Sequence, residues 1–193
     1  MRTFVRPLCL ALFLSLSACA SVPVSSIVPL MQVNFATTDA DQLRVALQLP
    51  EGLLSRPGGV ALELVLKREG SPDRSEQFLL VDTAAPADIE GLIGLQKPGQ
   101  RLAVFRIARA DVPRFAEVQA ALAEAMRNRI RGSLGFGIAT REFCLSGGKT
   151  PARYEASTYL MTAPASGWIT VTDGFDLASD PRIAAGLATL GPC

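Results

Sequence analysis

The sequence predicts a mainly β protein, an antiparallel two-layer sandwich with one amphipathic helix packed on it. Several segments alternate apolar and polar side chains with a period of two, which is typical of strands with one buried face. Residues 112–130 break this pattern and place apolar side chains at intervals of three and four, the period of a helix. Because this helix lies between two groups of strands, an α+β arrangement is the alternative.

The predicted strands are separated by turns rich in glycine and proline. They are residues 43–49, 60–66, 77–81, 102–107, 133–143, 156–162 and 168–172. In the first strand the alternation puts Arg44 and Gln48 on a face open to water, and in the second it puts Glu63 and Lys67 outside. The last two strands are predicted to form a hairpin.

The helix at residues 112–130 has recognisable ends. Asp111 is a residue type that caps helix starts, Pro113 suits the first turn, and Gly132 follows the end. Its apolar stripe is predicted to face the sheet and consists of Phe115, Val118, Leu122, Ala125, Met126 and Ile130. Residues 86–95 suggest a second, shorter helix, although their glycines weaken it.

The start of the chain is typical of a secretory signal. Arg2 and Arg6 precede the short apolar run Leu8–Leu16. As a helix this run reaches about 14 Å at ~1.5 Å per residue, whereas a bilayer core is about 30 Å thick. We therefore expect a signal peptide and not a membrane-spanning segment.

The segment Leu16-Ser17-Ala18-Cys19 follows that run and resembles the lipobox of bacterial lipoproteins. The resemblance implies cleavage before Cys19 and attachment of acyl chains to it, which would anchor the chain to a membrane stably. The alternative is an ordinary signal peptide in which Cys19 stands by chance. The expected organisation is a signal peptide at 1–18, a lipidated tether at 19–27 and a single β-rich domain at 28–193.

The resemblance also bears on location. Ala20 follows Cys19, and the absence of an aspartate at this position implies the outer membrane, with the domain facing the periplasm. The chain carries 19 basic and 18 acidic residues. A balanced charge and a secretory route both argue against a nucleic-acid partner.

The chain contains no histidine, which excludes Ser-His-Asp and Cys-His catalysis and every histidine-ligated metal site. We expect no cofactor and no metal. Ser146 and Lys149 have the spacing of a serine nucleophile with a lysine base. That pair needs a helix, and Gly147, Gly148 and Pro151 oppose one, so the segment is interpreted as a loop.

Three other groups have a possible binding role. Asp173, Asp176 and Asp180 could hold calcium, but their spacing fits turns and helix caps better. Arg127, Arg129 and Arg131 could touch anionic head groups, or could simply stabilise a helix C-terminus. The aromatic residues Tyr154, Tyr159 and Trp168 could form a surface site or belong to the core.

Two further cysteines remain after the lipidated one, Cys144 and Cys193. In an oxidising compartment we expect them to form a disulfide that closes a loop of about 50 residues. The alternatives are a free or intermolecular Cys193 and a buried, inert Cys144.

Two functions of different class follow from these observations. The favoured hypothesis is a lipid-anchored envelope protein with a non-catalytic binding or scaffolding role toward another envelope component. It depends on the missing histidine, the lack of a convincing catalytic constellation and the short tether. The alternative is a periplasmic hydrolase that uses carboxylates or Ser146 with Lys149.

Overall fold

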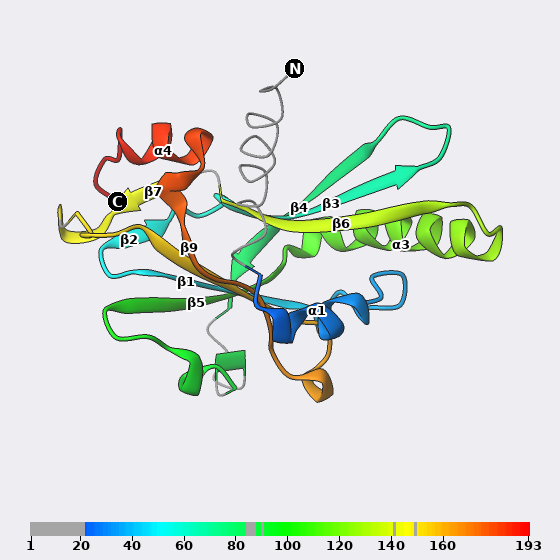
Figure 1. Ribbon diagram of the computed structural model, residues 1–193, viewed down its shortest axis with the longest axis horizontal. Helices are drawn as coiled ribbons and strands as arrows, with labels where there is room; N and C mark the ends of the chain where they lie inside the picture. The colour runs from blue at the N-terminus through cyan, green and yellow to red at the C-terminus, as the bar shows by residue number, and fades with distance from the viewer. Residues whose placement is uncertain (1–21, 84–87, 90, 141, 149) are drawn as a thin grey trace, which may run out of the picture.

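The predicted fold class is confirmed by a computed structural model, which describes residues 22–83, 88–89, 91–140, 142–148 and 150–193. A seven-stranded antiparallel sheet has the order β6-β3-β4-β5-β1-β8-β9, and β2 pairs with β7 in a small second sheet (Figure 1). The main helix, α3, lies beside β6 and packs into the core at its first turns.

The strands are β1 (Arg44–Pro50), β2 (Leu53–Ser55), β3 (Val60–Arg68), β4 (Arg74–Asp82), β5 (Gln100–Ile107), β6 (Gly132–Thr140), β7 (Phe143–Leu145), β8 (Glu155–Met161) and β9 (Ile169–Asp176). The α-helices are α1 (Val24–Met31), α3 (Val112–Arg127) and α4 (Pro181–Leu187). Short 3-10 turns are η3 (Ile93–Leu95), η4 (Arg109–Asp111), η5 (Ser146–Gly148), η6 (Pro164–Ser166) and η7 (Leu177–Ser179).

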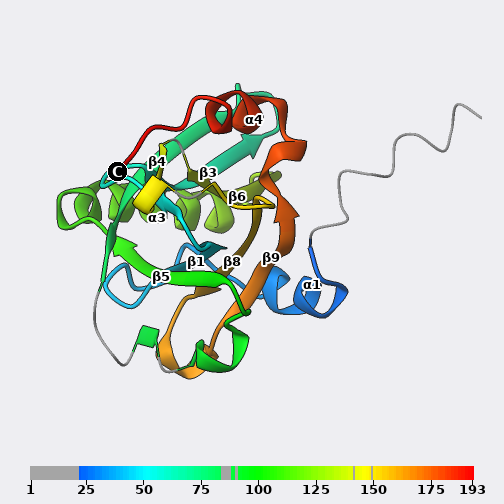
Figure 2. The same ribbon diagram turned by 90° about the vertical axis from the view of Figure 1, so that its left-hand side faces the viewer.

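The large sheet curls, so that its inner face encloses the core (Figure 2). Strand β1 lies in the interior of the sheet and pairs with strands from the second half of the chain on both sides. Val45 is opposite Phe105 of β5, and Arg44 is opposite Met161 of β8. The two layers expected of a sandwich are therefore opposite parts of one curled sheet.

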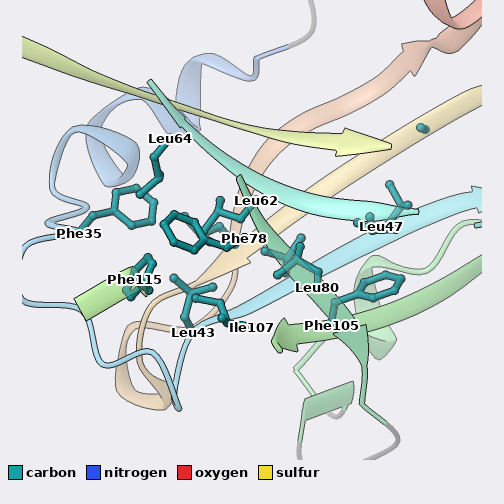
Figure 3. Packing of buried hydrophobic residues seen from close by; sticks show 14 of the residues in the cluster. Phe35, Leu43, Leu47, Leu62, Leu64, Phe78, Leu80, Phe105, Ile107 and Phe115 are labelled. Atoms are coloured by element: carbon teal, nitrogen blue, oxygen red, sulfur yellow. The ribbon is translucent and has the colours of Figure 1, made fainter. Parts of the chain in front are cut away.

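Alternate side chains of the strands fill the inside of the curl. Figure 3 shows the rings of Phe35, Phe78 and Phe115 gathered at one end of this core, with Phe105 and Leu80 farther along it. Phe115 of α3 lies edge-on to Phe78 of β4, with ring centroids 5.1 Å apart. Phe35 closes the same end from the loop before β1. The apolar period of two thus builds a continuous core.

The outer face of β1 is also buried, contrary to the prediction that it is open to water. Gln48 is 0% exposed there, and Ala46 packs with Leu92, Val104 and Tyr159 in a second apolar cluster. The chain between β4 and β5 crosses this face and supplies Leu92. Because that segment is distant in sequence, the alternation within β1 gives no sign of it.

The helix prediction is correct in position but too long at its end. Helix α3 ends at Arg127, and Arg129 adopts a left-handed backbone with φ 52°. Only the first part of the stripe is buried, since Phe115 and Val118 are in the core while Met126 is 62% exposed. The core ends before the helix does, so its last turn is largely exposed.

Several short elements differ from the prediction. Residues 24–27, expected in the tether, form the first half of α1, and residues 28–31, expected in the β-rich domain, complete this helix. The strand expected at 133–143 is divided into β6 and β7. Of the short helix expected at 86–95, residues 86, 87 and 90 lie outside the described residues, and η3 covers Ile93–Leu95. Within the described part of the chain, no helix is both long and apolar enough to span a bilayer.

Candidate functional site

Three hollows lie in a row along the inner side of β6. The first, of about 500 Å³, lies between α3, β6 and the loop after α1. The second, of about 390 Å³, lies between α1 and β6. The third, of about 320 Å³, lies on the inner face of the sheet between β6 and β9. We call this row of hollows the β6 trough.

Shared lining residues join the three hollows into one surface. Leu134 and Phe35 line the first and second hollows, and Val22 and Phe136 line the second and third. Phe35 and Phe136 are in ring contact, with centroids 5.2 Å apart. The trough therefore runs along the alternate residues of β6 that point inward.

The strand order explains why this side of the sheet stays open. β6 and β9 are the two ends of the order, and the third hollow lies between them. Helix α1 lies on this open side of the sheet. The part of α3 that lines the first hollow lies on the same side. An antiparallel sheet that curls without closing leaves apolar inner-face residues with no opposite strand to cover them.

The lining is mostly apolar, with positive charge at one end. The first hollow takes Leu122, Ala125 and Met126 from α3, and Lys67 and Arg68 from the end of β3. Lys67 also pairs with Asp73 at 3.4 Å, but both side chains are exposed, so the pair contributes little to stability. A trough of this kind is suited to a long apolar group with a polar or anionic end.

The sequence-predicted sites are not brought together at this trough. Cys19 and Lys149 lie outside the described residues. Ser146 is exposed in η5, where the backbone of Gly147 is left-handed at φ 65°. A left-handed residue in the middle of the turn breaks the helical geometry that a Ser-x-x-Lys pair needs.

The three aspartates near the end of the chain have separate roles. Asp173 faces Lys97, and the Asp176 carboxylate accepts a hydrogen bond from the backbone N–H of Ala178 at 2.9 Å. The backbone carbonyl of Asp180 accepts a hydrogen bond from Ala184 in α4. Among the residues that the structure describes, no three His, Cys, Asp or Glu side chains gather as a metal site.

The arginines and the aromatic residues are placed differently from each other. The exposed arginines are Arg127 at the end of α3 and Arg129 and Arg131 beyond it, and their chain neighbours Met126 and Ile130 line the first hollow. Tyr159 is buried in the second apolar cluster and Trp168 packs against it, so neither forms a surface site. Tyr154 is half-buried against the main core.

A polar network on the outer face of the sheet was not predicted. Lys97 Nζ lies 2.5 Å from Asp173 Oδ1, and the buried Ser157 hydroxyl donates to the same oxygen at 3.1 Å. The hydrogen bond from Lys97 is the main cause that lowers the pKa of Asp173; burial opposes it, and the hydrogen bond from Ser157 lowers the pKa by less. Desolvation by burial raises the pKa of the neighbouring Tyr159.

This network has the residue types of a catalytic site but the geometry of a structural one. The Ser157 hydroxyl accepts a hydrogen bond from the backbone N–H of Gly174 at 3.0 Å and is inaccessible. Tyr159 donates to Gln48 at 2.8 Å, also in a buried position. The contacts join the loop before β5 to β8 and β9, and the hydroxyl groups of Ser157 and Tyr159 are both buried.

The predicted pairing of Cys144 with Cys193 is confirmed. The two Sγ atoms lie 2.06 Å apart and the Cα atoms 4.9 Å apart, within the range of about 7 Å that a disulfide allows. Backbone hydrogen bonds support the same contact, since the N–H of Cys193 donates to Leu145 and that of Leu145 donates to Gly191. This fixes the last residues of the sequence against β7.

Comparisons with known proteins give no relative: no family model, no curated protein and no solved structure matches this chain. The geometry of the trough and the residues at the start of the sequence therefore carry the functional argument.

Proposed function

We propose that this chain is a lipid-anchored envelope protein with a non-catalytic binding role. It is held at the outer membrane, facing the periplasm, by acyl chains on Cys19. In the β6 trough it binds an apolar chain that belongs to another envelope component. The lipobox-like segment at 16–19 supports the anchor, and the trough supports the binding role.

The trough is the observation that carries the proposal. Its hollows share apolar lining residues and follow one strand, so they suit an extended group and not a compact polar one. Covering apolar surface with an acyl chain releases about 25 cal/mol for each Å² removed from water. Lys67 and Arg68 at the first hollow favour an anionic head group at that end of the chain.

The hydrolase alternative receives less support. Its carboxylate candidate Asp173 is held by Lys97 and Ser157, and its serine candidate Ser146 lies in a turn with left-handed glycines. Neither residue lines the β6 trough, where an envelope lipid would lie.

The test combines the state of Cys19 with ligand binding. Protein is extracted from membranes, its N-terminal residue is analysed by mass spectrometry, and its affinity for a fluorescent anionic fatty acid is measured. Ala125→Phe should fill the first hollow from α3 and weaken binding at least tenfold. Ala120→Phe is the matched control, because Ala120 is exposed on the same helix and does not line the trough.

Acylated Cys19 together with selective loss of binding in Ala125→Phe would support the proposal. An unmodified Cys19 within an intact chain would contradict the anchor. Equal affinities of the wild type and both variants would contradict binding in the trough. Melting temperatures of the two variants establish that each is folded.

A further inference from the structure

Helix α1 presents its apolar stripe to solvent. The stripe consists of Val24, Ile27, Val28 and Met31, which recur at the spacing of one helical face. Their exposed fractions are 82%, 45%, 62% and 81%, respectively. The fully buried position of the helix is a polar one, Ser26. This is the reverse of the usual arrangement, in which such a stripe faces the core.

The sequence around α1 has no charge. Residues 20–38 contain no Asp, Glu, Lys or Arg, so no charged group would lose its hydration if this segment met an apolar surface. The helix begins at Val24, five residues after Cys19. Five residues extend by at most about 17 Å. Acyl chains on Cys19 would therefore keep α1 within that distance of the lipid surface.

We propose that α1 lies on the lipid surface and buries this stripe among the acyl chains of the bilayer. The inference depends on the proposed acylation of Cys19 and adds a second, non-covalent membrane contact. The apolar face of this interfacial helix then consists of Val24, Ile27, Val28 and Met31.

The size of the patch favours a lipid surface over a protein. An eight-residue helix is about 12 Å long. Its four exposed side chains offer much less than the ~800 Å² that each partner buries in a stable protein interface. A tethered helix does not need that area, because the anchor already supplies a high local concentration of lipid. A patch too small to hold a free partner is therefore sufficient here.

This placement also orients the rest of the protein. Leu30, which is half-buried, lines the second hollow of the β6 trough, and Ile27 and Met31 of the exposed stripe border the same hollow. With α1 on the bilayer, the open side of the sheet lies next to the lipid surface. An apolar chain could then pass between the bilayer and the trough over a short distance.

The experiment uses the full-length, membrane-extracted protein in vesicles of phosphatidylethanolamine and phosphatidylglycerol. Val28→Cys and Met31→Cys carry an environment-sensitive fluorophore, and the matched control is Ser71→Cys, exposed in the turn between β3 and β4. A lipid-borne quencher should reduce emission at positions 28 and 31 several-fold more than at position 71. Mass spectrometry of the same samples reports the acylation of Cys19.

Equal quenching at positions 28, 31 and 71 in acylated protein would overturn the inference and leave the proposed anchor intact. Self-quenching between copies, removed by diluting the protein in the vesicles, would assign the stripe to a second copy and also overturn it. An unmodified Cys19 would overturn both the inference and the proposed anchor.

Discussion

The carboxylate of Asp111 accepts a hydrogen bond from the backbone N–H of Leu79 in β4 at 2.6 Å. Its other oxygen accepts one from Arg114 at 3.0 Å. Asp111 stands at the start of α3, but its side chain makes no capping bond to the helix. The residue predicted to cap the helix therefore fastens the helix to the sheet.

Removal of this carboxylate should loosen the junction between α3 and β4. Asp111→Ala is expected to lower the free energy of unfolding by about 1–3 kcal/mol, because the N–H of Leu79 and the guanidinium of Arg114 each lose an acceptor. Urea unfolding measures the change. Asp82→Ala removes the same charge from an exposed end of β4 and should have little effect. Equal losses in the two variants would show that the bond to Leu79 does not matter.

The two halves of α3 should respond differently to truncation. Phe115→Ala removes a fully buried ring that contacts Phe78, and we expect a loss of about 3–5 kcal/mol. Met126→Ala removes an exposed side chain on the same face and should change the free energy of unfolding by less than about 0.5 kcal/mol. Thermal or urea unfolding of both variants distinguishes them. A large loss in Met126→Ala would mean that the predicted stripe is buried along its full length.

Local sequence patterns were sufficient for most of the strands and for the main helix. The alternation at 60–66 corresponds to β3, where Leu62 and Leu64 are buried and Lys67 is exposed. Such patterns report which face of an element is apolar, but not what covers the opposite face. Gln48 and Ser157 are polar and fully buried, Gln48 beside Tyr159 of β8 and Ser157 beside Lys97 of the segment between β4 and β5, and no local period reveals either contact.

The disulfide should account for a large part of the stability. Cys144 and Cys193 are separated by 49 positions, and closing such a loop stabilises by about 4 kcal/mol on the chain-entropy estimate. Reductant should lower the urea midpoint of the wild type. The double variant Cys144→Ala/Cys193→Ala should be insensitive to reductant. An unchanged wild-type midpoint would show that the bond adds no stability in solution.

Acid should weaken the contact between Lys97 and Asp173. The pKa of Asp173 in the folded protein lies below its ordinary value of 3.8, chiefly because Lys97 donates a hydrogen bond to it. The stabilisation is therefore fully present above the unfolded pKa and is lost as pH falls through the folded one. Asp173→Asn should reduce stability at neutral pH and approach the wild type in strong acid. Asp82→Asn serves as the exposed control, and a difference independent of pH would contradict this assignment.

The β6 trough could not be predicted because it depends on how the sheet ends. Phe136 and Leu134 show the alternation of an ordinary half-buried strand. Their role follows from the position of β6 at one end of the strand order and β9 at the other. Strand order is a long-range property. Helix α1 was not predicted either, since residues 24–27 were expected in the tether.

The position of β1 between β5 and β8 affects the order in which the strands can pair. β3 and β4 are adjacent in sequence and pair directly, so this hairpin needs only a short loop to close. β1 precedes them, yet its partners β5 and β8 lie in the second half of the chain. The first strand must therefore wait for the later ones, and such non-local pairing slows folding. During that interval, the apolar residues of β1 are exposed, and a chaperone that shields them should raise the yield of native protein.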